Sequence, residues 1–200
     1  MYISPRKQKL YTVLAIITLV SIPIGILGFK YFQDWRTRAT SSPTPEDVRI
    51  SDLTETAVVI SWVTSDTSSE GWVKYSTSST LGDDSQITQD IRDVNEGQTT
   101  KRKTHYVSVS SLNPATNYYF IIGSGSQEYK DSEGNAFDFT TATSGSMSVP
   151  PSPDPVYGSV TNGGDQSAIV CITLGGEGER SFPVSTLTND SGNFEVDLSH

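Results

Sequence analysis

The chain begins with an apolar run that is long enough to cross a membrane. Leu10 to Phe29 are twenty residues without a charge; three cations lie just before this run and Lys30 follows it. At about 1.5 Å per helical residue, the run reaches roughly 30 Å, the thickness of the hydrocarbon core of a bilayer. We therefore predict a transmembrane signal-anchor helix over residues 10–32, with the lipid bilayer as its partner.

The charges on either side of the run predict its orientation. Arg6, Lys7 and Lys9 precede it, whereas the cations that follow are partly offset by Asp34, so the positive-inside rule favours a cytoplasmic N-terminus. We expect a single-pass protein of the cell membrane, with the rest of the chain extracellular. Two other interpretations stay open: a cleaved secretory signal, whose apolar region is usually about 7 to 15 residues long, and a buried helix of a soluble protein.

The part of the chain after the apolar run is strongly acidic. From residue 39 onward, eight Lys and Arg residues face 22 Asp and Glu residues, which gives a net charge of −14. Such a charge disfavours nucleic acids and anionic lipid surfaces, so we expect no nucleic-acid partner. The one basic cluster, Lys101, Arg102 and Lys103, is predicted to be a solvated hairpin tip.

Cysteine and histidine are too few for a disulfide or for the usual transition-metal sites. Cys171 is the single cysteine and lies in the apolar run Ala168–Leu174, so we expect it to fill a hydrophobic core. The two histidines, His105 and His200, stand far apart with no cysteine beside them. We predict no metal site and no cofactor, and we expect hydrophobic cores alone to stabilise the fold.

Two proline-rich stretches, 40–46 and 144–155, divide the chain. Prolines at this density favour extended, semi-rigid spacers. The predicted organisation is a cytoplasmic N-terminus (1–9), a transmembrane helix (10–32), a linker (33–46), a first β-domain (47–143), a Pro/Ser linker (144–155) and a partial second β-domain (156–200).

The middle segment alternates apolar and polar residues with the period of β-strands, and it contains no convincing amphipathic helix. Val58, Ile60 and Trp62, for example, share one face of a strand, and Val59 and Ser61 share the other. We predict an all-β fold in which two antiparallel sheets pack face to face, with Trp62 in the core.

Three segments of this region resemble strands of a fibronectin type III domain, an immunoglobulin-like β-sandwich. They are Val58-Val59-Ile60-Ser61-Trp62, Val73-Lys74-Tyr75 and the run from Leu112 to Phe120. In the last of these, Leu-x-Pro-x-Thr-x-Tyr resembles a tyrosine corner, in which the tyrosine hydrogen-bonds to the backbone just upstream. The resemblance implies that Tyr118 is this tyrosine and that it lies in the core.

Within that superfamily, the segments Thr104–Val107, Leu112–Phe120 and Phe137–Thr141 are similar to the N-terminal β-domain of purple acid phosphatases. The resemblance implies that catalysis would belong to a separate metallophosphatase domain with clustered Asp, Asn and His ligands. The sequence has neither a Gly-Asp-x-Gly nor a Gly-Asn-His-Glu run that could supply them. We therefore expect His105 to be a strand residue and not a metal ligand.

The last segment is similar to carboxypeptidase regulatory-like, or transthyretin-like, β-sandwiches. It has a Gly-x-Val opening at Gly158 and a hairpin with Asp190, Gly192 and Phe194. We expect a tight turn in which Asp190 caps the backbone and Gly192 has a positive φ, with calcium binding by Asp190 as the alternative. That family continues with further strands, and about 45 residues bury little apolar surface. We expect either a marginal domain or a fragment of a longer protein.

The remaining candidates for catalysis have simpler explanations. The acid pairs Asp83–Asp84 and Asp131/Glu133 lie in Gly- and Ser-rich surroundings, which indicates solvated turns more than a glycosidase pair. Gly123-Ser124-Gly125 lacks the strand-to-helix context of a phosphate loop, and there is no Gly-x-Ser-x-Gly elbow. We predict no catalytic, cofactor-binding or metal-binding residues, and we expect that the chain is not an enzyme.

These expectations combine into a membrane-anchored cell-surface protein. Its extracellular fibronectin type III-like domain would serve as a structural spacer or as a protein- or glycan-binding module for adhesion. The alternative is a non-catalytic accessory region of a longer exported enzyme, such as a purple acid phosphatase-like metallophosphatase or a glycan-active hydrolase.

Overall fold

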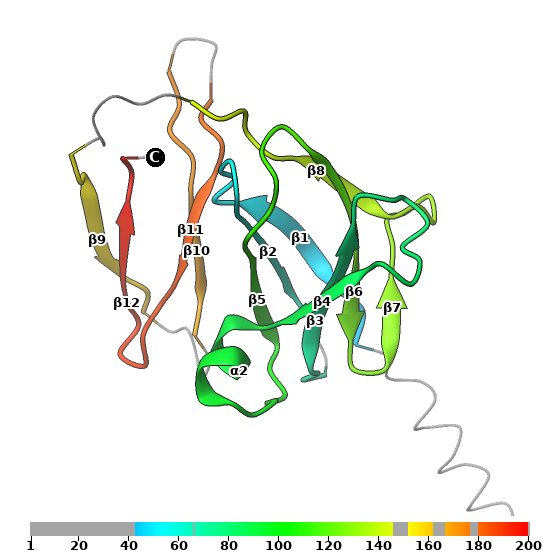
Figure 1. Ribbon diagram of the computed structural model, residues 1–200. Coiled ribbons are helices and arrows are strands. Elements are labelled where there is room, and N and C mark those ends of the chain that lie inside the picture. The colour runs from blue at the N-terminus through cyan, green and yellow to red at the C-terminus, as the bar shows by residue number, and fades with distance from the viewer. Residues whose placement is uncertain (1–42, 66, 146–151, 162–166, 177–179, 200) are drawn as a thin grey trace, which may run out of the picture. The chain divides into compact units, whose positions relative to one another are not determined.

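Alternating apolar and polar residues form strands through most of the described chain (Figure 1). The computed structural model describes residues 43–65, 67–145, 152–161, 167–176 and 180–199. The predicted segments 1–9 and 10–32, most of the linker 33–46 and part of the linker 144–155 lie outside these residues. Among the described residues, no helix is long and apolar enough to cross a membrane. The transmembrane helix at 10–32 therefore stays a prediction.

The first sheet is three-stranded and antiparallel. It contains β1 (Glu46–Ser51), β2 (Val58–Val63) and β5 (Thr104–Val109), in the order β1-β2-β5. Ile60 on the central strand β2 lies opposite Ile50 on β1 and Val107 on β5. Because partners directly opposite each other in neighbouring strands lie on the same face, this register places Ile50, Ile60 and Val107 on one face of the sheet.

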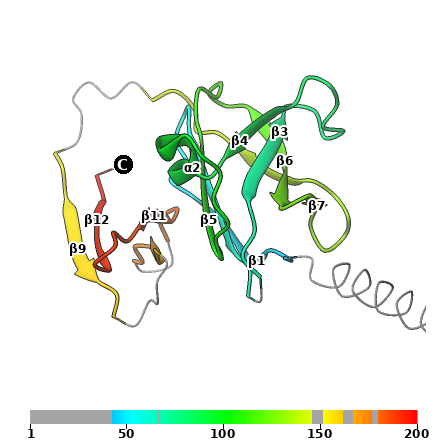
Figure 2. The same cartoon turned by 90° about the horizontal axis from the view of Figure 1, so that it is seen from below.

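The second sheet is five-stranded. It contains β4 (Gln86–Gln89), β3 (Gly71–Ser76), β6 (Asn117–Ser124) and β7 (Gln127–Tyr129) in that order, and β8 (Phe137–Thr140) also pairs with β6. The loop at 130–136 separates β7 from β8, so β6 has both as antiparallel partners on one side. The two sheets form the β-sandwich that the sequence predicted (Figures 1 and 2).

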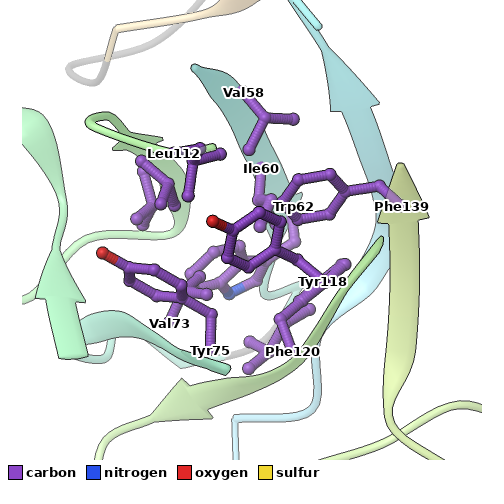
Figure 3. Close-up of a cluster of buried hydrophobic side chains, with 12 residues drawn as sticks. Val58, Ile60, Trp62, Val73, Tyr75, Leu112, Tyr118, Phe120 and Phe139 are labelled. Atoms are coloured by element: carbon purple, nitrogen blue, oxygen red, sulfur yellow. The ribbon is translucent and has the colours of Figure 1, made fainter. Parts of the chain in front are cut away.

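Side chains from both sheets form one hydrophobic core. Figure 3 shows its aromatic and aliphatic side chains pointing toward one another. Trp62 and Tyr118 are both buried, which confirms the predicted strand phase. The cluster comprises Val58, Ile60, Trp62, Val73, Tyr75, Val107, Val109, Leu112, Tyr118, Phe120, Ile122 and Phe139.

The predicted tyrosine corner is present. The backbone N–H of Asn113 donates a hydrogen bond of 3.0 Å to Oη of Tyr118, and the Tyr118 ring stacks on Phe139 with a centroid distance of 5.7 Å. Ala115, in the turn before β6, has a φ of 49°, a left-handed conformation that usually favours glycine. The corner thus fixes the connection between the two sheets, and one strained residue lies within it.

Gly123 allows a tryptophan to lie flat against the second sheet. It lies opposite Trp72 on the neighbouring strand, and a Cβ at position 123 would be 1.8 Å from Cε2 of the indole. The indole Nε1 donates a hydrogen bond of 3.2 Å to the carbonyl oxygen of Gly125. The sequence Gly123-Ser124-Gly125 is therefore the end of a strand and the turn after it, packed against an aromatic ring.

The described part of the middle segment contains one short helix that no sequence pattern predicted. Helix α2 (Ile91–Glu96) has Asp90 as its N-cap, which accepts a hydrogen bond from the backbone N–H of Arg92, and it ends at Gly97 in a left-handed conformation. Six residues are fewer than two helical turns, so they give no recognisable 3.6-residue periodicity.

The C-terminal segment forms two separate two-stranded pairs. They are β10 (Ile169–Ile172) with β11 (Val184–Leu187), and β9 (Pro155–Ser159) with β12 (Asn193–Asp197). Cys171 is only half-buried, so the prediction that it fills a core was wrong in degree.

The turn between β11 and β12 differs from the prediction in its capping residue. The side chain of Asn189, and not that of Asp190, accepts hydrogen bonds from the backbone N–H groups of Ser191 and Asn193 at 3.0 Å each. Asp190 is exposed. Gly192 has a φ of 79°, as the turn chemistry predicted.

Candidate functional site

Both acid pairs that the sequence singled out lie in turns. Asp83 and Asp84 are exposed in the turn before β4, and Glu133 is exposed in the loop between β7 and β8. One oxygen of Asp131 accepts hydrogen bonds from the backbone N–H groups of Glu133 and Asn135. Asp131 therefore shapes its turn, and the other three carboxylates are exposed to solvent.

The first polar cluster of the domain joins helix α2 to strand β5. Asp90 is buried, and its two carboxylate oxygens accept hydrogen bonds from Nε and Nη2 of Arg92 at 2.8 and 2.7 Å. The same carboxylate accepts the backbone N–H of Tyr106 at 2.9 Å. Burial alone would raise the pKa of Asp90, but the Arg92 guanidinium and the backbone N–H groups hold this pKa below its usual value.

The predicted basic tip at 101–103 is partly wrong, because Arg102 is not solvated. Its guanidinium forms an ion pair with the buried carboxylate of Asp93 and a second one with Glu96 at 3.3 Å. Asp93 also accepts the backbone N–H of Thr100 at 3.1 Å. The loop after α2 is therefore tied back to the helix, while Lys101 is exposed as expected. The sequence carried no signal for this pairing beyond the charges themselves.

His105 lies in strand β5, as predicted, and is the most buried ionisable ring of the domain. Its ring stacks on Trp62 with centroids 4.9 Å apart, and its Nε2 is 3.2 Å from Oγ of Ser69, which is 2.7 Å from Oγ of Ser124. Gly71 makes room for the ring, since a Cβ there would be 2.1 Å from Nδ1. Burial lowers the pKa of His105 to about 4, so the imidazole is neutral at physiological pH.

A serine beside a histidine is an arrangement that nucleophilic catalysis uses. Whether the pair Ser69–His105 can act in this way depends on how accessible the two side chains are. Here the exposed fraction is 3% for Ser69, 1% for His105 and 0% for Ser124. A substrate carbonyl has no approach to a hydroxyl at that depth. The arrangement favours a structural role, in which three polar side chains satisfy one another between the two sheets.

The described residues contain no group of three or more His, Cys, Asp or Glu side chains that could hold a metal ion. The two buried carboxylates, Asp90 and Asp93, are engaged with arginines. Their nearest charged neighbours are thus cations, which disfavours a divalent ion at the same place.

A second polar cluster connects the sandwich to the C-terminal segment, and no pattern in the sequence predicted it. Its centre is Ser185 on β11, whose backbone N–H donates to both carboxylate oxygens of Asp52 at 3.1 Å. Its hydroxyl donates to Asp52 Oδ2 at 2.6 Å and lies 2.6 Å from Oγ of Ser51. The hydroxyl of Tyr106 donates to the carbonyl oxygen of Ser185 at 3.1 Å. Partners more than 130 residues apart leave no local pattern in a sequence.

The two sheets, their antiparallel order and the tyrosine corner define a fibronectin type III-like β-sandwich. Residues 45–141, a little under half of the chain, match the family described as Purple acid Phosphatase, N-terminal domain. This segment therefore has the fold of a fibronectin type III-like domain, and its sequence is similar to that family. The match ends before the C-terminal segment, whose resemblance to carboxypeptidase regulatory-like domains stays a prediction.

Several solved structures show a distant likeness. The sensor domain of the anti-sigma factor RsgI4 from Pseudobacteroides cellulosolvens is 13% identical over 50% of this chain and 76% of its own, with a TM-score of 0.36. The FN1–FN3 domains of chicken CNTN1 are 16% identical over 50% of this chain and 32% of their own, with a TM-score of 0.36. The fn3 domain of human collagen alpha-1(XX) is 18% identical over 55% and 99%, with a TM-score of 0.31. No curated protein matches the chain.

Proposed function

We propose that the chain is a membrane-anchored surface protein whose fibronectin type III-like domain is a non-catalytic structural spacer. The observation that carries the proposal is the use of the buried ionisable groups. Asp90 and Asp93 hold α2 and the loop after it, and His105 holds β5 against Trp62 and Ser69. Groups engaged in this way fix strands and loops in place, and they have neither the exposure nor the freedom that catalysis requires.

The membrane anchor in this proposal comes from the uncharged run Leu10–Phe29 and its cationic flanks. The test uses the full chain with an epitope tag after residue 200. Protease added to intact cells should remove the tag, and carbonate washing should leave the protein in the membrane pellet. Leu19→Arg, near the middle of the run, should release it from the pellet, whereas the matched variant Leu19→Ala should not. Complete protection of the tag in intact cells, with digestion in lysed cells, would overturn the orientation.

An adhesive version of the same proposal makes a different prediction. Binding by sandwiches of this kind resides in their loops, so the fold does not name a ligand. Cells that display the chain should bind a protein- or glycan-coated surface no better than cells that carry the Leu19→Arg variant if the domain is only a spacer. Saturable binding that is lost on changing the exposed 130–136 loop would favour adhesion.

The competing proposal is an accessory region of a longer exported phosphatase. The match of residues 45–141 to the N-terminal domain of purple acid phosphatases favours it. The deciding observation is the complete reading frame: a downstream domain with clustered Asp, Asn and His ligands would establish the accessory role, and further β-modules or a sorting signal would establish the spacer.

A further inference from the structure

The outer face of the β1-β2-β5 sheet is buried, although one face of the outermost sheet in a two-layer sandwich is normally wet. On β2, Val58, Ile60 and Trp62 point into the core, so Val59 and Ser61 point outward. Yet the exposed fraction is 7% for Val59, 1% for Ser61 and 8% for the outward Tyr106 on β5. A third layer must cover this face.

The β10–β11 hairpin supplies that layer. In both views β5 lies between this hairpin and the larger sheet (Figures 1 and 2). Thr104 Oγ1 on β5 donates to the carbonyl oxygen of Ser167, just before β10, at 3.0 Å. Burial raises the pKa of the Cys171 thiol on β10, in agreement with a partly covered strand. All of these residues belong to the same compact unit of the chain, Ser42–His200.

Asp52 is the residue on which the contacts converge. It follows β1 with a φ of 49°, a conformation that costs a non-glycine residue about 1 kcal/mol. Its backbone N–H donates to the carbonyl oxygen of Pro183 at 2.9 Å, and its carboxylate accepts both the N–H and the hydroxyl of Ser185. Asp52 thus accepts the main-chain N–H of Ser185, and the hydroxyl of Tyr106 donates to the carbonyl oxygen of the same residue. The contacts with the hairpin hold Asp52 in this strained backbone conformation.

The C-terminal segment depends on this surface because it has little core of its own. The residues of β10 are all only half-buried, and Tyr157, Leu174 and Phe182 are exposed. A short pair of strands is marginal in water without a face to pack against. The outer face of the β1-β2-β5 sheet, which has both apolar and polar residues, provides such a face. The Asp52 carboxylate lies at its rim.

We propose that the outer face of the β1-β2-β5 sheet is a docking surface for the chain's own β10–β11 hairpin, with Asp52 as the clamp. The β-sandwich and the C-terminal segment then form one rigid joint. This inference deepens the proposed spacer role and rests on it for its biological meaning: a spacer transmits orientation only if consecutive modules are fixed to each other. The docking itself is a physical claim that can be tested separately.

The first test is hydrogen–deuterium exchange on the full chain in detergent micelles. Asp52→Ala should speed the exchange of the amides of β10 and β11 at least tenfold while the amides of β2 and β6 stay protected. Asp138→Ala is the control, because Asp138 is an exposed carboxylate on β8, in the other sheet. It should leave β11 unchanged. Unaltered protection of β11 in Asp52→Ala would overturn the proposal.

The second test uses Cys171, the single thiol of the chain, as a reporter in case Asp52→Ala does not fold. Tyr106→Phe removes the hydroxyl that contacts the carbonyl oxygen and Oγ of Ser185 and Oδ2 of Asp52, and it changes no formal charge. Faster alkylation of Cys171 would therefore report exposure of the thiol. We expect labelling to be several-fold faster than in Tyr119→Phe, a control on the second sheet. Equal rates would overturn the docking and leave the spacer proposal standing, because the protease test on intact cells decides that independently.

Discussion

At the scale of single residues, His105 makes the stability of the domain depend on pH. Burial lowers the pKa of His105 to about 4, whereas the unfolded chain has the ordinary value of about 6.5. Below pH 6.5, His105 is protonated in the unfolded state but stays neutral in the folded state. Stability therefore falls progressively between pH 6.5 and 4, by about 3 kcal/mol at most. Asp90, whose pKa is lowered, loses its own contribution as the pH falls through its folded pKa.

We expect the measured pH dependence to follow this histidine. Urea unfolding at pH 7 and at pH 4.5 should show a large loss of stability in the wild type and a smaller one in His105→Gln, which has no proton to take up. His200→Gln, which removes the other histidine of the sequence, should keep the wild-type slope. An identical slope in His105→Gln would mean that carboxylates alone produce the acid sensitivity.

Ala115 offers a second prediction at this scale. Its φ of 49° strains an alanine by about 1 kcal/mol, and glycine relieves that strain at the expense of some unfolded-state entropy. Ala115→Gly should therefore leave the free energy of unfolding unchanged or raise it by up to about 1 kcal/mol. Ala142→Gly, at an ordinary φ, should lower it. Thermal unfolding of the two variants side by side measures whether the free energy of unfolding changes in opposite directions. A clear loss of stability in Ala115→Gly would contradict the prediction.

At the scale of elements, Asp90 holds helix α2 to strand β5. Asp90→Ala would leave Arg92, which has a mostly buried side chain, without its carboxylate, and would leave the Tyr106 backbone N–H without its acceptor. Breaking one side of a buried ion pair costs about 3 to 5 kcal/mol. We expect a loss of this size in urea unfolding, with early exchange of amides 91–97. Asp83→Asn, in an exposed turn, should change stability by less than about 0.5 kcal/mol. Comparable losses in both variants would argue against this role of Asp90.

The elements that the sequence predicted are those with a repeating pattern or a local motif. The alternation around Trp62 and the run that ends at Tyr118 predicted strands, their buried faces and the tyrosine corner. Helix α2 could not be predicted because one and a half turns show no periodicity. The capping role of Asn189 was assigned to its neighbour because both residue types can cap a turn.

At the scale of the whole molecule, the tertiary contacts were the part that the sequence could not predict. The joint between Asp52 and Ser185 brings together residues 133 positions apart, and the Arg102 ion pairs depend on a helix that was not expected. Charge and apolarity at these positions were visible, but their partners were not, because a long-range contact depends on the fold and not on local spacing. The membrane helix at 10–32 stays a prediction from the sequence.

A further prediction concerns metals. If hydrophobic cores and the polar clusters alone hold the fold, a chelator should not lower the melting temperature of the full chain, since a structural metal would contribute its binding energy to folding. Thermal unfolding with and without EDTA should coincide, and a phosphomonoester should not turn over when iron, zinc or manganese is added. A drop of many degrees with EDTA, or turnover that His105→Gln abolishes, would favour the phosphatase-like alternative.

The contact between Gly123 and Trp72 also constrains how this domain can diverge. A methyl group at position 123 would be 1.8 Å from the indole, so no side chain can appear there while the tryptophan keeps its place. The two positions are therefore bound to change together: lineages that lose the tryptophan are free to lose the glycine, and those that keep it are not. Among relatives, a substituted position 123 should coincide with a small residue at position 72.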